Sequence, residues 1–455
     1  LLLLSFSDVA SGYANDGKVV YEGEKHLRNI RQLTFGGSNA EGYFSFDNKK
    51  LTYQATLSGS TNCDQIYQMD LNDDPRTQTP KRMSTGLGAC TCSFFMGDDE
   101  HFLYAGTFHH VQYPDIQPPT ASFDTCNPKK CLDLETIEDP KLRDLCNTSY
   151  TWDVFNEYDI FLADKYGNIV SRLTDAPGYD AEGVVSPDGK LIAYTSMSSG
   201  DLELWIMNAD GSGKRQLTDT LGYDGGSFFS PDGKKLIFRA SRPTTPEAIQ
   251  KYKDLLSYDL VAPTEMELFW IPVDGSHREV QITHLGGANW APYYHHDNNR
   301  IIFSTDHNNT AGFGAFDLWM IEESGDLETL ERITWDDDQF DAFAMFSWDG
   351  KQLVWGSSRN ASLEYDMNLF IADWVDPPYE EEQTTHATEE PMATSPSETT
   401  PRGDDEVKTT ATKMKEKTTA TTPKENESTT SVSVSPLSPL YLLSSLVLLS
   451  IRLLQ

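Results

Sequence analysis

The chain is built around a repeat that recurs six times, and each copy carries a tight turn rich in Asp, Asn and Gly. The clearest copy spans 172–211, and the Leu-Thr of the next copy follows 44 positions after it, from Thr174 to Thr218. Turns of this kind need central residues that tolerate positive φ, as Asn, Asp and Gly do. The six turns are Asp47-Asn48, Asp98-Asp99, Asp188-Gly189, Asp232-Gly233, Asp297-Asn298 and Asp349-Gly350.

The segments between the turns alternate or run apolar, and they are rich in β-branched and aromatic residues. Four short strands per unit and six units predict an all-β fold, a six-bladed β-propeller of four-stranded antiparallel blades. The last unit lacks its own outer strand. The unmatched segment 26–34 is expected to supply it, which closes the ring and removes an open sheet edge. The inner strands of the six blades are expected within 40–70, 92–164, 181–210, 225–274, 289–323 and 341–373.

The Ser-Pro-Asp-Gly-Lys turn at 186–190, with a Leu-Thr segment near the following Asp-Gly turn, resembles the TolB-like propeller repeat. The same repeat occurs in the propeller domains of prolyl-oligopeptidase-like peptidases. The resemblance covers about 27–374. It weakens in the second and fifth units, where Met96-Gly97-Asp98 and His295-His296-Asp297 replace the motif. Because the sequence has no Gly-x-Ser-x-Gly motif and no remaining length for an α/β-hydrolase, a propeller without a catalytic hydrolase domain is expected.

Composition excludes two classes of protein. The 455 residues include 36 Lys and Arg against 70 Asp and Glu, a formal net charge of −34, so a broad nucleic-acid interface is excluded. An aromatic content of 11% excludes a chain that is disordered throughout. The acidic balance favours cations, basic partners or simple solubility.

The two ends of the chain predict an extracellular location. Residues 1–10 are typical of a signal-peptide remnant, and the propeller is expected over 26–375. Residues 376–430 are rich in Thr, Ser, Pro and Glu and predict a disordered stalk. The apolar stretch 431–455 predicts a C-terminal anchor signal for a glycolipid (GPI) anchor, with a single membrane span as the alternative. Asn147, Asn308 and Asn360 are candidate N-glycosylation sites.

The long insertions are expected on one face of the propeller. In antiparallel blades, the connections between the second and third strands share a face with the connections between blades. The three long insertions, 108–157, 242–267 and 306–316, are all of the first kind. Since loops on a rigid scaffold commonly bind ligands, the elaborated face is the predicted binding face.

Polar residues that precede or begin the innermost strands are the candidate ligand-binding residues. A ring of carboxylates and amides at the channel mouth suits Ca²⁺ or another divalent cation, which takes oxygen ligands. The alternative is that each Asp caps its own turn. The candidates are Asn39, Glu41, Tyr179, Asp180, Glu182, Tyr223, Asp224, Asn289, Trp290 and Asp341, of which Asp180, Glu182, Asp224 and Asp341 are the metal candidates.

Candidate catalytic residues are His109, His110, Arg239 and Arg242. The adjacent histidines suit acid–base work or a transition metal, and the arginines could hold an anionic substrate. The alternatives are a solvated or packed loop for the histidines and surface ion pairs for the arginines. The sequence also predicts a capped amphipathic helix starting at Pro246 that covers part of this face.

Six cysteines allow 15 pairings, and the sequence does not choose among them. A bond from Cys63 to Cys90 or to Cys92 is geometrically reasonable, because the three residues lie on the same face. Cys126, Cys131 and Cys146 lie together in the insertion of the second unit.

Two function classes follow. The first is an extracellular cell-surface binding protein that recognises a protein, peptide or glycan through its elaborated face. The second is a metal-assisted enzyme of the channel mouth, a lyase or hydrolase acting on acidic oligosaccharides. The repeat also resembles that of oligogalacturonate lyases, which implies a metal, a His and an Arg in the channel. A secreted matrix scaffold that binds Ca²⁺ weakly at many places is a third possibility.

Overall fold

The computed structural model describes residues 19–57, 63–108, 129–309, 314–335, 339–363 and 366–376. The expected signal remnant, stalk and anchor signal lie outside the described residues, as do His109 and His110. The described residues all belong to one compact unit, and they include no helix long and apolar enough to cross a membrane.

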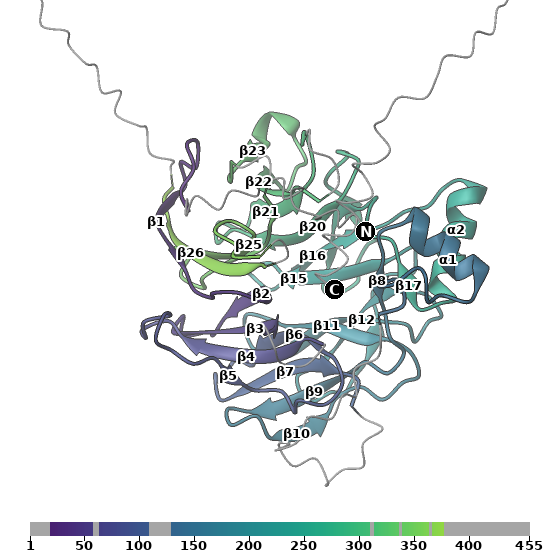
Figure 1. Ribbon diagram of the computed structural model, residues 1–455, viewed down its shortest axis with the longest axis horizontal. Coiled ribbons are helices and arrows are strands. Elements are labelled where there is room, and N and C mark those ends of the chain that lie inside the picture. The colour runs from purple at the N-terminus through teal and green to yellow at the C-terminus, as the bar shows by residue number, and fades with distance from the viewer. Residues whose placement is uncertain are drawn as a thin grey trace, which may run out of the picture. The chain divides into compact units, whose positions relative to one another are not determined.

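Six four-stranded antiparallel sheets form the propeller, as predicted (Figure 1). Strand one of each blade is the innermost, and strand four is the outermost. Blade 1 consists of β2 (Ser38–Phe44), β3 (Lys50–Thr56), β4 (Gln65–Asp70) and β5 (Lys81–Arg82). Blade 2 consists of β6 (Cys90–Phe95), β7 (His101–Gly106), β9 (Asp159–Asp164) and β10 (Ile169–Arg172). Blade 3 consists of β11 (Asp180–Val185), β12 (Leu191–Ser196), β13 (Glu203–Asn208) and β14 (Arg215–Gln216). Blade 4 consists of β15 (Asp224–Phe229), β16 (Lys235–Ala240), β18 (Glu267–Pro272) and β19 (Val280–Gln281). Blade 5 consists of β20 (Asn289–Tyr294), β21 (Arg300–Thr305), β22 (Asp317–Glu322) and β23 (Glu331–Arg332). Blade 6 consists of β24 (Asp341–Phe346), β25 (Gln352–Ser357), β26 (Asn368–Trp374) and the N-terminal strand β1 (Leu27–Gln32).

The ring is closed by the N-terminal strand, which confirms the expectation from the repeat pattern. The strand β1 (Leu27–Gln32) pairs antiparallel with β26, so that Leu27 lies opposite Trp374 and Gln32 opposite Phe370. Blade 6 therefore joins the two ends of the repeat region, and its sheet edge is not left open.

The repeat residues hold each blade through side-chain bonds to the backbone. Ser186 Oγ donates to Asp188 at 2.7 Å and accepts from the backbone N–H of Leu191 at 2.9 Å. The Leu-Thr motif works in the same way, because Thr174 Oγ1 accepts the N–H of Ile160 at 2.9 Å. These bonds satisfy backbone groups at the ends of the strands, which explains why the motif recurs.

Apolar side chains between neighbouring blades form the main core. Buried Leu, Ile, Val, Phe and Tyr side chains from strands one to three of the blades make one large cluster, including Phe44, Leu103, Val184, Phe238 and Ile301. This burial is the main source of stability for a chain of this size.

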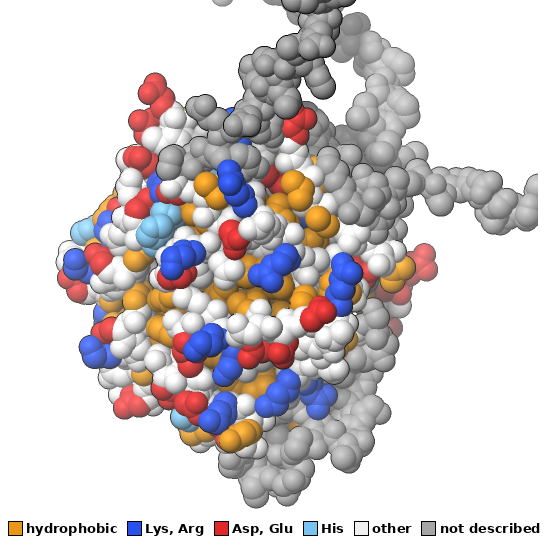
Figure 2. Space-filling model, turned by 90° about the vertical axis from the view of Figure 1, so that its left-hand side faces the viewer, with side chains coloured by type: hydrophobic (Ala, Val, Ile, Leu, Met, Phe, Trp, Pro, Cys, Tyr) orange, Lys and Arg blue, Asp and Glu red, His pale blue; other side chains and the backbone are white. Residues whose placement is uncertain are grey.

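The described parts of the long insertions lie on one face, which is called the cap face below. The opposite face carries the repeat turns and is called the turn face; Figure 2 views the molecule from the side away from the cap helices. The expectation that long connections are confined to the cap face is wrong in blade 1. There the connection 71–80 between β4 and β5 is long, and Gln78 fastens it to the backbone of Asp70.

Candidate functional site: the capped channel

The insertions of blades 2 and 4 join to form one structure, called the cap and comprising 129–158 and 241–266. It contains α1 (Pro140–Thr148), α2 (Pro246–Leu256) and a small sheet in which β8 (Trp152–Asp153) pairs with β17 (Leu260–Val261). In Figure 1 the two helices lie side by side beyond this sheet. The predicted helix is thus confirmed, with Thr245 as its N-cap and Tyr252 and Leu255 buried.

Polar contacts fasten the two insertions to each other. Lys130 Nζ donates to Asp259 at 2.7 Å, Lys141 pairs with Asp254 at 2.8 Å, and the Tyr258 hydroxyl donates to Asp139 at 2.8 Å. A separate apolar cluster that includes Ile137, Leu145, Leu255 and Leu260 lies between the same segments. The cap is therefore a packed unit with its own core.

A disulfide between Cys131 and Cys146 closes the first half of the cap. Cys63 is also disulfide-bonded, whereas Cys90 and Cys92 are free thiols. The suggested bond from Cys63 to Cys90 or Cys92 is therefore wrong. Residues on the same face can lie close together without bonding, because a disulfide further requires matched Cβ directions.

Aromatic residues of the cap close the channel mouth. The ring of Trp152 lies 5.0 Å from that of Trp290, and Tyr150 lies 6.3 Å from Trp290 on the same cluster. Trp290 Nε1 donates to the Pro263 carbonyl at 2.7 Å, and only 1% of this residue is exposed. Trp290, a predicted ligand-binding residue, is thus buried in the contact between the cap and the propeller.

Beneath the cap, the innermost strands share a backbone irregularity. Each has a β-bulge at the same position, and the bulged residue has a positive φ in all six blades. A bulge of this kind redirects a side chain. The six residues, called the axial ring below, are Glu41, Cys92, Glu182, Gly226, Ala291 and Phe343.

Arg239 occupies the place that Gly226 leaves free. A Cβ at Gly226 would lie 2.7 Å from Arg239 Cζ, so the guanidinium fills the space of the missing side chain. Arg239 Nη2 donates to Glu182 and to the Tyr223 hydroxyl, both at 3.0 Å, and its Cζ lies 4.7 Å from the Trp152 ring centroid. This cation–π contact links blade 4 to the cap.

Glu182 has hydrogen-bond partners at both oxygens. Tyr223 and Thr195 donate hydroxyl bonds at 2.6 Å, and the backbone N–H of Gly226 donates at 2.8 Å. Together with Arg239, these partners make Glu182 a fully hydrogen-bonded carboxyl group that joins blades 3 and 4.

Glu41 and Cys92 form the less satisfied side of the axial ring. Glu41 Oε2 and Arg239 Nε are buried without a hydrogen-bond partner among the described residues. Burial raises the pKa of Glu41 to about 7, and burial with nearby carboxylates raises the pKa of the Cys92 thiol well above its usual value. A carboxyl that titrates near neutrality in a channel is a candidate functional group.

The remaining carboxylate and amide candidates lie two residues before the axial ring and are buried. Asn39 donates to the carbonyls of Gly36 and Met367, and Asn289 donates to that of Met266 at 2.8 Å. Asp341 accepts from Arg359 at 2.6 Å. These bonds engage all three side chains with other groups of the protein.

Asp224 and Asp180 are also engaged by other side chains of the protein. Arg242 donates to Asp224 and lies 3.5 Å from Glu279. Burial raises the pKa of Asp180 to about 7, against hydrogen bonds from Ser196 and Thr174. Tyr179 packs on the ring of Tyr158 at 5.7 Å.

A metal site therefore has no grouped ligands here. Within the described ranges, no three His, Cys, Asp or Glu side chains lie together in a way that could hold a metal ion. The assignment of Asp180, Glu182, Asp224 and Asp341 as metal ligands stays a prediction.

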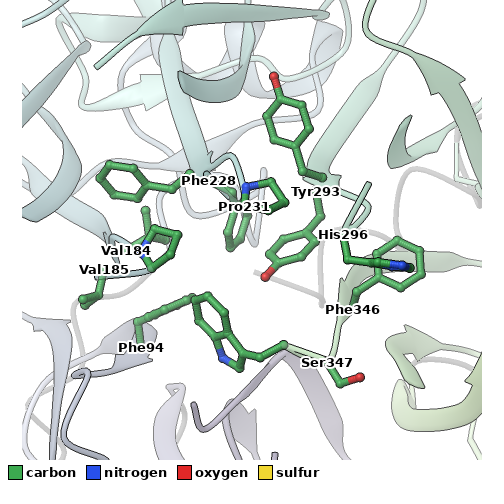
Figure 3. A pocket seen from close by; sticks show the side chains of 13 residues that line it. Phe94, Val184, Val185, Phe228, Pro231, Tyr293, His296, Phe346 and Ser347 are labelled. Atoms are coloured by element: carbon green, nitrogen blue, oxygen red, sulfur yellow. The ribbon is translucent and has the colours of Figure 1, made fainter. Parts of the chain in front are cut away.

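At the other end of the channel, the turn face has an apolar pocket that the sequence analysis missed. It has a volume of about 110 Å³ and is lined by residues from five blades, and Figure 3 shows Val184, Phe228, Pro231 and Tyr293 around the opening. The sequence does contain a sign of this pocket. In four repeat units the residue directly before the turn Asp is one that lines the pocket: Pro187, Pro231, His296 and Trp348. Apolar and aromatic residues at turn positions on four units mark a lined opening.

The predicted glycosylation sites differ in exposure. Asn147 on α1 and Asn308 after β21 are exposed, whereas the Asn360 amide donates to Gln32 at 2.6 Å.

Comparison with solved structures finds the same architecture in distant proteins. Putative TolB from Agrobacterium tumefaciens is similar with 17% identity over 74% of this chain and 91% of its own, at a TM-score of 0.45. TolB from Acinetobacter baumannii shares 15% identity over 64% of this chain and 53% of its own, at 0.40. An oligogalacturonate lyase in complex with manganese shares 15% identity over 76% of this chain and 93% of its own, at 0.41.

No protein-family model matches the chain, and no curated protein matches it by sequence. The six-bladed propeller is shown by the sheets of this chain, and the similarities to solved structures concern the fold alone.

Proposed function

We propose that this chain is a cell-surface binding protein that recognises a protein, peptide or glycan through the cap face of its propeller. The observation that carries the proposal is the cap itself. Two insertions about 100 residues apart in the sequence meet in one sheet, share a core and are fastened by ion pairs such as Lys130–Asp259. A preformed surface on a rigid scaffold binds without a large ordering cost.

The direction in which the chain leaves the propeller supports this use of the cap face. Strand β26 ends at Trp374 on the turn face, where Asp376 pairs with Arg300. A stalk that starts after Asp376 would join the propeller opposite the cap. The cap face would then be the one directed away from the attachment point.

An extracellular location is part of the proposal, and two features support it. The Cys131–Cys146 disulfide is typical of an oxidising compartment, and Asn147 and Asn308 are exposed enough to accept glycans. Attachment through a GPI anchor at the C-terminus is the form we propose.

A binding screen tests the proposal. The full chain would be tested against a panel of glycans and of extracellular protein domains, as wild type and as two surface variants. Leu132 in the cap and Val170 on the outer strand β10 are 47% and 52% exposed, so Leu132→Asp and Val170→Asp are matched changes. We expect the cap variant to weaken binding at least tenfold and the β10 variant to leave it unchanged. Equal effects of the two variants would contradict the proposal.

A second candidate function is a channel enzyme acting on acidic oligosaccharides, and Glu41 is the observation that favours it. Its unpartnered oxygen and its pKa of about 7 suit acid–base chemistry. The arginines assigned to the substrate are already engaged, Arg239 with Glu182 and Arg242 with Asp224. Product formation from acidic oligosaccharides by the wild type, lost in Glu41→Gln, would favour the enzyme over the binding protein.

A further inference from the structure

The boundary between blades 1 and 2 carries an open groove on the turn-face side of the propeller. It has a volume of about 470 Å³, within the usual range for small-ligand sites. It runs beside β3, β4 and β7 and is walled by the connection 71–80. The lining residues used below are Lys50, Gln68, Lys81, Phe95, Lys165 and Tyr166.

The equivalent boundary between blades 4 and 5 is bridged by side chains. There Lys235, the first residue of β16, pairs with Glu323, and the Tyr294 hydroxyl donates to the same carboxylate at 2.7 Å. Lys235 also lies over the ring of Trp270, at 4.7 Å from its centroid. This boundary thus has its cation, its carboxylate and its aromatic platform matched to one another.

Strand register shows which residues replace these in the groove. Lys50 opens β3 as Lys235 opens β16, and each lies opposite the last residue of strand three. Lys165 and Glu323 each donate their backbone N–H to the residue before strand two of their own blade. By the same register, Gln68 stands in place of Trp270 and Phe95 in place of Tyr294.

These replacements leave hydrogen-bond donors without acceptors. Lys50 and Lys81 have no carboxylate partner within 4 Å among the described residues, and Gln68 Nε2 is buried without a hydrogen-bond partner. Lys81 Nζ reaches only the backbone oxygen of Lys165, at 3.1 Å. Where blade 5 supplies Glu323, blade 2 supplies the cation Lys165. At the position of Glu323 the groove therefore has a cation, and the carboxylates that line it, Asp70, Asp73, Asp99 and Glu100, form no ion pair with Lys50 or Lys81 among the described residues.

Most of the acids beside the groove have partners of their own. Asp99 accepts the backbone N–H groups of Phe46 and Asp47, and Asp70 accepts from Asn72. Glu100 pairs with Lys165. These carboxylates do not neutralise Lys50 and Lys81 by direct contact.

An exposed aromatic ring stands at the groove beside these cations. Tyr166 is 68% exposed, and the amines of Lys81 and Lys165 lie 5.8 and 5.6 Å from its ring centroid. An aromatic face packs against the C–H face of a sugar ring, and flanking ammonium groups bind its carboxylate or sulfate. The hydroxyl group of Thr79 adds a further polar group along the wall, whereas the Gln78 amide is bonded to the backbone of Asp70.

We propose that the groove between blades 1 and 2 is a binding site for an anionic saccharide, with Tyr166 as the stacking surface and Lys50 and Lys81 as the anion-binding groups. The site is distinct from the cap face and does not depend on the function proposed for it. The chain carries a net charge of −34, so non-specific attraction of a polyanion does not account for binding here.

Titration calorimetry on the full chain tests the proposal with chondroitin 4-sulfate tetrasaccharide, which carries both carboxylate and sulfate groups. Neutral chitotetraose and hexaglutamate are the comparison probes. We expect the sulfated tetrasaccharide to bind, with affinity that falls as salt rises, and both comparison probes to bind at least tenfold more weakly. No binding of the tetrasaccharide, or equal binding of hexaglutamate, would overturn the proposal.

Three variants localise the site. Lys165→Glu places a carboxylate opposite Lys50, as Glu323 lies opposite Lys235, so it should fold normally and reduce affinity at least tenfold. Tyr166→Ala should do the same for the saccharide. Lys190→Ala removes an exposed lysine paired with Asp188 on blade 3 and should leave affinity unchanged. The proposal fails if Lys165→Glu, with wild-type thermal stability, binds the tetrasaccharide as the wild type does.

Discussion

The guanidinium of Arg239 lies on the indole of Trp152, with Cζ 4.7 Å from the ring centroid, and this contact joins the inner wall of the propeller to the cap. Arg239 comes from β16 of blade 4, whereas Trp152 belongs to the insertion of blade 2. The same guanidinium binds Glu182 of blade 3. One side chain thus connects three segments that are distant in the sequence, and removing any of its partners should affect the others.

Trp152→Ala should lower the free energy of unfolding by about 2–4 kcal/mol, because it removes a large packed ring and uncovers the Arg239–Glu182 pair. Chemical denaturation monitored by circular dichroism measures the change. Trp335→Ala is the matched control: Trp335 also lies under an arginine, with Arg332 at 4.8 Å, but is 43% exposed. The control should lose about 1 kcal/mol or less. Equal losses would show that Trp152 has no role beyond surface packing.

Gly226→Ala should be more destabilising than its backbone angle alone implies. The residue has a φ of 56°, and a Cβ would lie 2.7 Å from Arg239 Cζ. Gly200 also has a positive φ, of 93°, but nothing lies within 4 Å of its Cβ position. Gly200→Ala should therefore cost about 1 kcal/mol from backbone strain, and Gly226→Ala at least twice as much. Thermal unfolding of both variants measures the difference, and equal costs would contradict the described packing of Arg239.

Glu41 should make the protein less stable as the pH rises. Its pKa is raised to about 7 from an ordinary value of 4.5, so the folded state binds one more proton than the unfolded state between those values. Stability from this group is fully present below about pH 4.5 and is lost as the pH rises through about 7. Glu41→Gln should flatten this part of the profile, measured as the unfolding midpoint against pH.

Asp188 provides the control of opposite sign for that experiment. The hydrogen bond from Lys190 lowers the pKa of Asp188 to about 2, so its contribution is present above its ordinary value of 3.8 and is lost as the pH falls through about 2. Asp188→Asn should alter only the acidic end of the profile. If Glu41→Gln leaves the slope between pH 4.5 and 7 unchanged, the burial described for Glu41 is wrong.

Loss of the Cys131–Cys146 disulfide should loosen the cap while the blades stay folded. The two cysteines are separated by 15 positions, for which loop closure contributes about 3 kcal/mol. In the Cys131→Ser, Cys146→Ser double variant, limited proteolysis should cut within 129–158 first, and the blades should keep their unfolding midpoint. Cys90→Ser replaces a free buried thiol and should not create this cleavage. An equal protease pattern in the wild type and the double variant would contradict the prediction.

The repeat made the propeller predictable, because its signals are local. Ser186 and Asp188 lie two positions apart and are hydrogen-bonded to each other in one turn. The turn can therefore be recognised from a short stretch of sequence. The closure by β1 was predictable for a related reason, since one outer strand was missing and one segment was unmatched.

The site was less predictable, because it depends on contacts between distant segments. Trp152 and Val261 lie opposite each other in the small sheet of the cap, although they are more than 100 positions apart in the sequence. Neither insertion has a sequence pattern that predicts this pairing. The polar residues Asn39 and Asn289 were visible as candidates, but only the bulge that follows each one decides which side chain faces the axis. The groove beside Lys50 depends on Lys165, which stands in blade 2 where Glu323 stands in blade 5. This equivalence is known only from the strand register of the two blades.

Amide hydrogen exchange on the full chain tests most directly whether the cap is one unit formed by both insertions. Lys130→Ala removes the ion pair with Asp259 and changes only the first insertion. The structure predicts faster exchange in both 129–158 and 241–266, with the innermost strands unchanged, because the two segments share one core. Faster exchange confined to 129–158 would show that the insertions are independent loops, and the binding surface proposed here would then not exist.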